Sequence, residues 1–289
     1  MRNLDENTIT DEAIRRLEGC KDARFKEILT SLTRHLHEFA REVKLTEAEW
    51  MQGLEYLTAV GKKCDDKRQE FILLSDTLGL SMLVVALNNA KPPGCTEATV
   101  FGPFHTDKAS DFRNGDDLAQ GASGEPAFVR GTVRGLDGKP VPGAVIDVWQ
   151  ADGDGIYDVQ YTDKDGALFA RGRLRSEADG RYWFRSILPE FYSIPTDGPV
   201  GDWIARAGRH PFRPAHLHFM IQAPGYERLI THVFRGDDKY LDSDAVFGVR
   251  SSLVSDWVRH EPGTAPDGTR MDKPYYTLDF DFVLAPAGK

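Results

Sequence analysis

Residues 209–246 read RHPFRPAHLHFMIQAPGYERLITHVFRGDDKYLDSDAV and contain four of the eight histidines of the chain. Within this stretch, residues 215–222 follow Pro214 and are mostly apolar and β-prone, which predicts a strand that starts just after the proline. Side chains two residues apart in a strand point to the same face. We therefore expect His216 and His218 to lie side by side, close enough to bind one metal ion.

The same His-Leu-His pattern occurs at residues 35–37, inside a segment with helical periodicity. At about 100° per residue, these two side chains diverge by roughly 200° and cannot share a metal ion. We assign this pair to a solvated helix. The strand pair by itself is equally compatible with one core histidine and one chance neighbour, so other residues have to decide.

Length and composition describe an ordinary globular protein. The chain has 289 residues, of which 40% are hydrophobic and 28% charged, enough for a sizeable core in one or two domains. Its net charge of −9 and the lack of a lysine-arginine block argue against a nucleic-acid-binding surface. The longest strongly apolar run, residues 78–87, is too short to be a transmembrane segment, and residues 1–10 lack a signal-peptide core. We expect a cytoplasmic protein without a transmembrane segment.

The three cysteines are Cys20, Cys64 and Cys95. They are widely spaced, odd in number and form no CxxC pair, which favours reduced structural thiols over disulfides or a zinc site.

The first 90 residues are predicted to be helical. A helix start is expected at Thr10, and apolar residues recur at helical spacing over residues 25–43. Residues 46–49 spell a capping box, which predicts a third helix from there through Val60. A fourth helix is expected over about residues 66–89. Its second half is apolar on most faces, so it should be buried against the rest of the protein or a second subunit.

The remaining chain has the pattern of strands. Alternating apolar runs occur at 128–133, 144–149, 181–184, 229–234 and 278–283, with Asp-Gly turn signals between several of them. We predict an α+β protein, with a helical N-terminal domain over residues 1–98 followed by an antiparallel β-sandwich over residues 99–289. Two long tyrosine-containing loops, 151–170 and 190–213, are expected to carry function.

The residues in these loops indicate which metal ion the histidines would bind. The usual zinc and calcium spellings are absent, and residues 152–155 resemble half of a calcium loop but lack its later glutamate. A phenol with a pKa near 10 binds as phenolate only to a strongly Lewis-acidic ion, which favours ferric iron. The tyrosines in reach are Tyr157, Tyr161, Tyr182 and Tyr192, although any one tyrosine is more often a core or rim aromatic.

Three segments, VWQADGDGIY at 148–157, YSIPTDGPVG at 192–201 and RHPFRPAHLHF at 209–219, resemble the intradiol ring-cleaving dioxygenases. These are non-haem iron(III) enzymes, and the resemblance extends over essentially the whole chain. It implies one Fe(III) per subunit, held by Tyr157, Tyr192, His216 and His218. In the family, the tyrosine at the Tyr192 position leaves the iron when substrate binds, and the arginine at the Arg213 position lies over the substrate. Tyr161 and Tyr182 fall outside the motifs and are expected to be structural.

Residues 71–76, 231–234 and 240–250 are most similar to the hydroxyquinol 1,2-dioxygenase branch of this family. Many catechol-cleaving relatives have glutamine where this chain has His232, so we expect His232 to support the ligands rather than bind iron. The resemblance implies a substrate pocket formed by Leu73, Asp76, Val100, Phe101, Gly102, Pro103, Phe104, Ile194, Pro195, Arg213 and Val246. In it, the carboxylate of Asp76 could accept a hydrogen bond from a third ring hydroxyl.

The implied reaction opens hydroxyquinol (benzene-1,2,4-triol) with O2 to 3-hydroxy-cis,cis-muconate, the enol form of maleylacetate, in the catabolism of aromatic compounds. Catechol or a chlorocatechol is the alternative substrate. A non-catalytic β-sandwich binding module is the more distant alternative. The resemblance also implies a homodimer formed through the N-terminal helices, with a phospholipid at the subunit interface.

Overall fold

The computed structural model describes residues 3–66, 68–161 and 166–288. The chain divides into two compact units, with the boundary between Lys62 and Lys63. The sequence places the domain boundary later, between residues 98 and 99, and that boundary stays a prediction. Among the described residues, Cys20, Cys64 and Cys95 form no disulfide.

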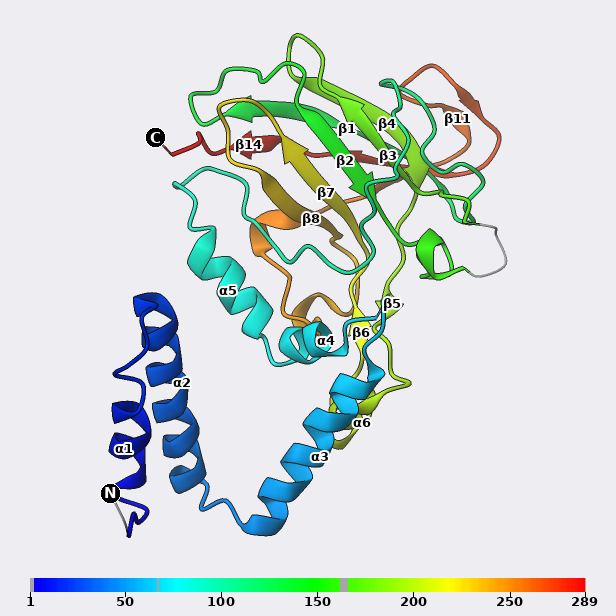
Figure 1. The fold of residues 1–289 in the computed structure, drawn as a ribbon. Coiled ribbons are helices and arrows are strands. Elements are labelled where there is room, and N and C mark those ends of the chain that lie inside the picture. The colour runs from blue at the N-terminus through cyan, green and yellow to red at the C-terminus, as the bar shows by residue number, and fades with distance from the viewer. Residues whose placement is uncertain (1–2, 67, 162–165, 289) are drawn as a thin grey trace. The chain divides into compact units, whose positions relative to one another are not determined.

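The first unit contains helices α1 (Ile9–Arg15) and α2 (Ala23–Glu42) and all but the last residue of α3 (Glu47–Lys63) (Figure 1). The start of α1 lies one residue before the predicted Thr10. The Asp22 side chain caps α2 by accepting a hydrogen bond from the backbone N–H of Phe25. The predicted capping box of α3 is confirmed, because Thr46 and Glu49 each accept a hydrogen bond from the backbone N–H of the other.

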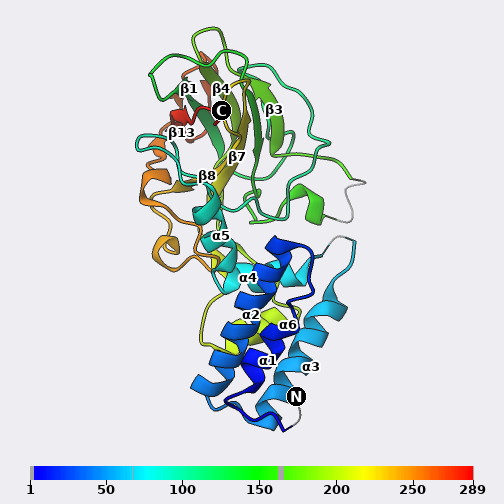
Figure 2. The ribbon, with the colours of Figure 1, turned by 60° about the vertical axis from the view of Figure 1, so that its left-hand side comes forward.

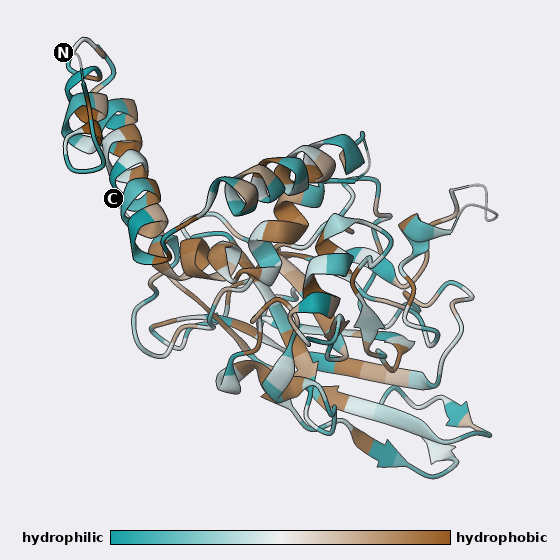
Figure 3. Ribbon diagram, turned by 90° about the horizontal axis from the view of Figure 1, so that it is seen from below, coloured by the Kyte–Doolittle hydropathy of each residue, from teal (hydrophilic) through white to brown (hydrophobic). Residues whose placement is uncertain are grey.

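Helix α2 exposes the apolar side chains whose spacing predicted it. Six of them are about half exposed: Phe25, Ile28, Leu32, Leu36, Phe39 and Val43. Figure 3 shows hydrophobic and hydrophilic residues interleaved along the N-terminal helices. His35 and His37 lie on α2, and His37 shares a hydrogen bond with the Thr10 hydroxyl at 2.9 Å. Their assignment to a helix is confirmed.

The prediction of a single helix over residues 66–89 is wrong. The structure has α4 (Glu70–Thr77) and α5 (Leu80–Asn88), bent by 80° at the break between them. Gly79 lies at this break with a φ of 76°, a left-handed conformation that glycine adopts without strain. No single helix in the described ranges is long and apolar enough to cross a membrane, although this bent pair has the necessary combined length and composition. Helix α6 (Pro199–Arg206) follows much later in the chain.

Two five-stranded sheets form the body of the second unit. The first contains β1 (Pro126–Gly135), β4 (Arg181–Ile187), β10 (Val258–His260), β13 (Tyr275–Asp279) and β14 (Phe282–Leu284). The second has the order β3 (Arg171–Arg175), β2 (Val145–Trp149), β7 (His216–Gln222), β8 (Leu229–Arg235) and β9 (Val254–Ser255). Two ribbons pair β5 (Tyr192–Ser193) with β6 (Phe212–Arg213) and β11 (Gly263–Thr264) with β12 (Arg270–Met271). The 3₁₀ helices are η1 (Asp158–Gln160), η2 (Leu241–Ser243) and η3 (Ser251–Leu253).

The two sheets pack face to face around one hydrophobic core (Figure 2). Val129, Phe184 and Leu278 of the first sheet belong to the same buried cluster as Ile146 and Phe219 of the second. Strands β2, β4, β7 and β14 contribute alternate residues to this core, which is the period-two pattern of a sandwich. The predicted sandwich is confirmed.

The sheets are mixed rather than purely antiparallel. The long strand β1 pairs in parallel with β13 and then with β14, and β8 pairs in parallel with β9. The run predicted as one strand over 278–283 is divided between β13 and β14, where the backbone N–H of Phe280 donates to the carbonyl of Arg130 at 2.9 Å. Alternation predicts which residues face the core, but it contains no information on strand direction.

Candidate metal centre and substrate pocket

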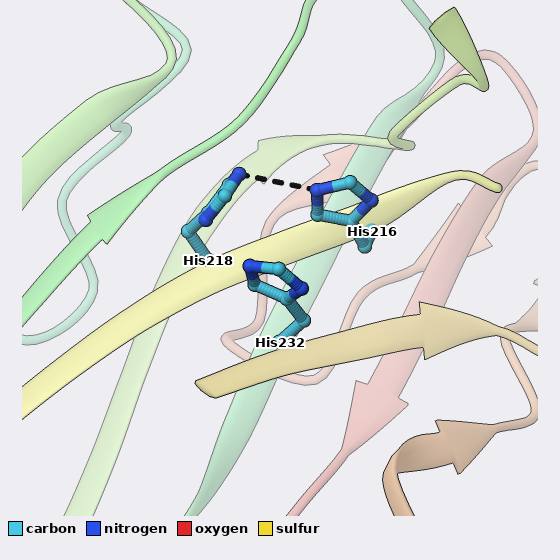
Figure 4. A group of neighbouring side chains, drawn as sticks. All are labelled: His216, His218 and His232. Carbon is cyan, nitrogen blue, oxygen red and sulfur yellow. Dashed lines mark hydrogen bonds between the residues drawn. The ribbon is translucent and has the colours of Figure 1, made fainter. Parts of the chain in front are cut away.

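Strand β7 confirms the predicted strand and the predicted pair of imidazoles. Leu217 and Phe219 point into the sandwich core, so His216 and His218 lie on the opposite face. Their Nε2 atoms are 3.1 Å apart, and both side chains are buried (Figure 4). The two rings therefore present nitrogen atoms to one point.

The tautomer of His216 follows from its other ring nitrogen. Nδ1 lies 2.7 Å from the carbonyl oxygen of Pro214, which can only accept, so Nδ1 carries the proton and donates it. Burial, followed by the nearby Arg213 charge, lowers the pKa of His216 to about 3. The ring is neutral at physiological pH with a lone pair on Nε2, the form that binds metal ions.

Tyr157 brings a phenol to the same point. Its hydroxyl is 2.9 Å from Nε2 of His218, and its backbone N–H donates to the side chain of Gln160, which fixes the start of η1. Burial, and then the neighbouring Tyr192, raise the pKa of Tyr157 well above 10. A phenolate at this position therefore requires a cation beside it.

Tyr192 and Arg213 are register partners across the β5–β6 ribbon. Nη1 of Arg213 donates to the Tyr192 hydroxyl at 3.3 Å, and the rings of Tyr192 and Tyr157 have centroids 5.3 Å apart. The ribbon thus places Tyr192 next to Tyr157 and adds the buried guanidinium group of Arg213.

Asp244 forms a buried ion pair with Arg213. Nε and Nη2 of Arg213 donate to the two carboxylate oxygens at 3.1 and 3.4 Å. Burial alone would lower the pKa of Arg213, but Asp244 and then Tyr192 raise it above its ordinary value. Burial likewise would raise the pKa of Asp244, but Arg213 holds it below its ordinary value. Asp244 lies in the 240–250 segment that resembles the hydroxyquinol branch, but its pairing with Arg213, 31 residues away, was not predicted from the sequence.

His232 faces His218 across the β7–β8 pair and stacks on His216, with ring centroids 4.5 Å apart. Nitrogen atoms of His216, His218 and His232 all lie within 4.8 Å of one another. Nδ1 of His232 is 3.5 Å from Nη2 of Arg213, so this ring lies between the histidine pair and the arginine. Trp149 stacks on the other side of His218 at 4.6 Å.

Several predicted pocket residues surround this cluster. Phe104 stacks on Tyr157 with ring centroids 4.3 Å apart. A Cβ atom at Gly102 would lie 3.1 Å from Cε1 of His218, so the backbone there packs directly on the imidazole. Val100, Ile194 and Val246 are buried, Leu73, Gly102, Phe104 and Pro195 are partly buried, and Phe101 and Pro103 are exposed.

Asp76 of α4 lies within electrostatic reach of Arg213 and Asp244. Burial raises its pKa, while a hydrogen bond to Ser81 and the charge of Arg213 oppose that increase. Leu73 is three residues earlier, on the same side of α4.

The hydroxyls of Tyr161 and Tyr182 donate hydrogen bonds to groups outside this cluster. Tyr161 donates to Oδ2 of Asp152 at 2.6 Å, and Tyr182 donates to the carbonyl of Phe280 at 2.7 Å. Oδ1 of Asp152 accepts from two backbone N–H groups in its own loop. The carboxylate that resembled a calcium ligand therefore closes the loop leading to Tyr157.

A second buried ion pair, between Arg171 and Asp158, lies next to Tyr157 in the structure. Nε and Nη2 of Arg171 donate to the carboxylate of Asp158, and Nη2 also donates to the carbonyl of Phe104 at 3.0 Å. Arg171 thus connects the residue after Tyr157 with the residue that stacks on it. Neither residue of this pair was predicted from the sequence.

The donor set fits a ferric ion. Two neutral imidazole nitrogens and a phenol oxygen converge within hydrogen-bond distance, and Tyr192 is adjacent. Nitrogen and phenolate donors in a buried site match a strongly Lewis-acidic ion better than calcium or magnesium, which prefer carboxylate and carbonyl oxygens. Burying several lone-pair atoms that face one another also costs free energy unless a cation lies between them.

Both the helical region and the sandwich match known protein families. Residues 98–286 match the family described as "Dioxygenase", and residues 22–96 match "Catechol dioxygenase N terminus". The chain is 61% identical to the 6-chlorohydroxyquinol 1,2-dioxygenase of Cupriavidus pinatubonensis over 99% of both chains. It is 50% identical to the hydroxyquinol 1,2-dioxygenase of Nocardioides simplex, over 98% of this chain and 96% of that one.

Among solved structures, the hydroxyquinol 1,2-dioxygenase of Pseudomonas putida DLL-E4 superposes with a TM-score of 0.91. The two chains are 49% identical, and the match covers 98% of this chain and 99% of that one. Similarity of this extent covers both the helical region and the sandwich. The chain therefore belongs to the intradiol ring-cleaving dioxygenase family.

Proposed function

We propose that this protein is a non-haem iron(III) dioxygenase that cleaves hydroxyquinol between its two adjacent hydroxyl-bearing carbons. One ring C–C bond breaks and both atoms of O2 enter the product, 3-hydroxy-cis,cis-muconate or its keto form maleylacetate. The convergence of His216, His218 and Tyr157 on one buried point is the observation that carries the proposal. Relatives named for hydroxyquinol and 6-chlorohydroxyquinol support the substrate.

The proposed ligands are Tyr157, Tyr192, His216 and His218. Bound there, ferric iron would supply a Lewis acid that binds the diol oxygens and accepts charge from the ring. The geometry favours Tyr192 as the exchangeable ligand, because Arg213 already provides its hydroxyl oxygen with a hydrogen-bond donor. The Tyr157 hydroxyl instead lies 2.9 Å from Nε2 of His218, which is itself a proposed ligand atom.

Arg213 is proposed to stabilise negative charge on the bound ring. Its guanidinium group is buried, permanently protonated and held by Asp244. A fixed cation in a site without water stabilises developing charge more strongly than one in solvent. His232 is proposed to hold the imidazole pair and Arg213 in register by packing between them.

Asp76 and Leu73 are proposed to recognise the third hydroxyl group and the edge of the ring. The pocket would also include Val100, Phe101, Gly102, Pro103, Phe104, Ile194, Pro195 and Val246. A partly buried carboxylate that bonds a substrate hydroxyl is left unpaired by catechol, which lacks that group. This argument favours hydroxyquinol over catechol or a chlorocatechol. The relative named for 6-chlorohydroxyquinol makes that chlorinated triol a second candidate substrate.

The direct test is oxygen uptake by the iron-loaded protein with hydroxyquinol, 6-chlorohydroxyquinol and catechol, each corrected for autoxidation of the substrate. We expect the highest kcat/KM with one of the two triols. A higher kcat/KM with catechol would contradict the substrate assignment. No uptake with any of them would contradict the enzyme assignment.

We also propose a homodimer formed through the N-terminal helices, with phospholipid bound at the interface. The exposed apolar row on α2 supports this, because contiguous apolar surface of that kind marks interaction sites. Light scattering and lipid extraction test the two parts. A monomer at all concentrations would contradict the first, and a lipid-free purified protein would contradict the second. A cytoplasmic location remains a prediction for cell fractionation.

A further inference from the structure

Arg209 joins two segments that belong to the proposed substrate pocket. Nη1 of Arg209 donates to the carbonyl of Thr77 at 2.6 Å, and Nη2 donates to the carbonyl of Ala245 at 2.9 Å. Thr77 follows Asp76 at the end of α4, and Ala245 precedes Val246. One guanidinium group therefore holds the backbone next to a pocket residue on each side.

Phe247 adds a second connection between the same segments. The guanidinium carbon of Arg209 is 4.9 Å from the centroid of the Phe247 ring, a cation–π distance. That ring lies on the bend between α4 and α5, where a Cβ atom at Gly79 would be 3.3 Å from Cδ2 of Phe247. Arg209, Phe247 and Gly79 thus pack as one contact, which we call the Arg209 clamp.

The loop that carries Val246 is held in a strained conformation. Phe247 has a φ of 60°, which residues other than glycine rarely adopt and which persists only when the surroundings enforce it. The enforcing contacts come from Asp244, whose carboxylate accepts the backbone N–H groups of Val246 at 3.2 Å and Gly248 at 2.8 Å. The same carboxylate pairs with Arg213.

The two sides of the clamp approach the same charged pair. Asp76 lies within electrostatic reach of both Arg213 and Asp244, and Val246 is bonded directly to Asp244. A change in the distance between the end of α4 and residues 244–248 would therefore move Asp76 relative to the site where the ring is proposed to bind. Arg209 makes hydrogen bonds to both sides of that gap.

We propose that Arg209 is a positioning residue that sets the spacing between Asp76 and Val246, and thereby the preference for a ring with a third hydroxyl group. The inference rests on the proposed function. Arginine suits the role because its planar fork donates in two fixed directions, whereas lysine offers a single ammonium group on a flexible stem. The guanidinium group of Arg209 contacts Thr77, Ala245 and Phe247, so it acts through the two backbone segments.

The expected effect distinguishes positioning from general support. Replacing Arg209 with lysine should raise KM for hydroxyquinol, because the hydrogen bond from the third hydroxyl to Asp76 depends on the spacing. KM for catechol should change less, since catechol makes no such bond. Loss of one hydrogen bond of ordinary strength corresponds to roughly a tenfold lower hydroxyquinol-to-catechol ratio of kcat/KM. The colour of the iron-loaded protein should not change.

The first experiment needs no substrate. Amide hydrogen exchange of Arg209→Lys is compared with wild type and with Arg206→Lys, an exposed arginine on α6. We expect faster exchange in both residues 73–79 and residues 244–249 for Arg209→Lys, and no change for Arg206→Lys. Unchanged exchange in either segment of the Arg209 variant would overturn the clamp.

The second experiment measures kcat and KM for both substrates with the same variants and with Phe247→Leu. The leucine variant keeps the two hydrogen bonds of Arg209 and removes only the ring contact, so it remains informative if Arg209→Lys unfolds. Lower hydroxyquinol preference in both clamp variants, with Arg206→Lys unchanged, supports the inference. An unchanged ratio in enzymes that turn over hydroxyquinol overturns it. A wild type inactive on hydroxyquinol contradicts the proposed function instead, and the exchange experiment still decides whether the clamp exists.

Discussion

The guanidinium group of Arg213 and the carboxylate of Asp244 form a bidentate ion pair, and both side chains are almost completely buried. Removing one partner of such a pair leaves an uncompensated charge in a medium that solvates it poorly. Asp244 also accepts two backbone N–H groups of its own loop, so the pair fixes the loop and the arginine together.

Replacing Asp244 with alanine should therefore lower the free energy of unfolding by about 3–5 kcal/mol. Urea denaturation of the variant and of wild type measures the difference. Asp279 provides the matched control, because its ion pair with Arg130 is exposed and should contribute only about 0–1 kcal/mol. Equal losses for Asp244→Ala and Asp279→Ala would contradict the importance of burial.

Replacing His218 with alanine should abolish iron binding, because it removes one of two imidazoles facing the same point and the partner of Tyr157. Phenolate-to-iron(III) charge transfer gives such proteins a red-brown colour, so iron content and visible absorption should fall together. His35→Ala is the control, since it changes the same HxH spelling on an exposed part of α2. Full iron content and colour in His218→Ala would show that His218 is not a ligand.

Replacing Asp76 with alanine should reduce selectivity for the triol. The ratio of kcat/KM for hydroxyquinol to that for catechol is expected to fall roughly tenfold or more, since the third hydroxyl loses its acceptor. Steady-state kinetics with both substrates measure this ratio, and Asp202→Ala, an exposed carboxylate on α6, should leave it unchanged. A parallel loss of activity with both substrates would assign Asp76 to folding instead of recognition.

A pH dependence is expected from Asp197. Hydrogen bonds from Arg68 and then Lys63 lower the pKa of Asp197 to about 2. The folded-state pKa lies below the ordinary value of 3.8, so this interaction stabilises the protein fully above that value and is lost as the pH falls towards 2.

Urea midpoints of wild type and Asp197→Asn should therefore differ by a constant amount between pH 7 and pH 5 and should converge as the pH falls from about 4 towards 2. No large difference is expected at any pH, because Asp197 is mostly exposed. A difference that grows with acidity would contradict the direction of the pKa shift.

The sequence predicted those parts of the site that depend on local structure. A strand after Pro214 is enough to place His216 and His218 together, because two-residue periodicity is a property of any strand. The convergence of Tyr157 and Tyr192 on these rings depends on two loops folding over the sheet, so it rested on the resemblance alone. The pairing of Asp244 with Arg213 was missed because ion pairing between distant residues leaves no periodic signal.

The bend at Gly79 was missed for a related reason. The apolar residues on either side continue with helical spacing, and an isolated glycine inside such a run is often tolerated within one helix. What stabilises the bend here is tertiary, since the ring of Phe247 packs on Gly79. The parallel pairing of β1 with β13 was equally invisible, because direction is decided by the path of the intervening chain.

Single-turnover cleavage of hydroxyquinol under ¹⁸O₂, followed by mass spectrometry of the product, tests the central claim most directly. Intradiol cleavage by the site around His216, His218 and Tyr157 predicts a ring-opened dicarboxylate that contains two heavy oxygen atoms, one in each new carboxylate. A ring-opened product without ¹⁸O, or an intact hydroxyquinol ring after prolonged incubation with the iron-loaded protein, would contradict it.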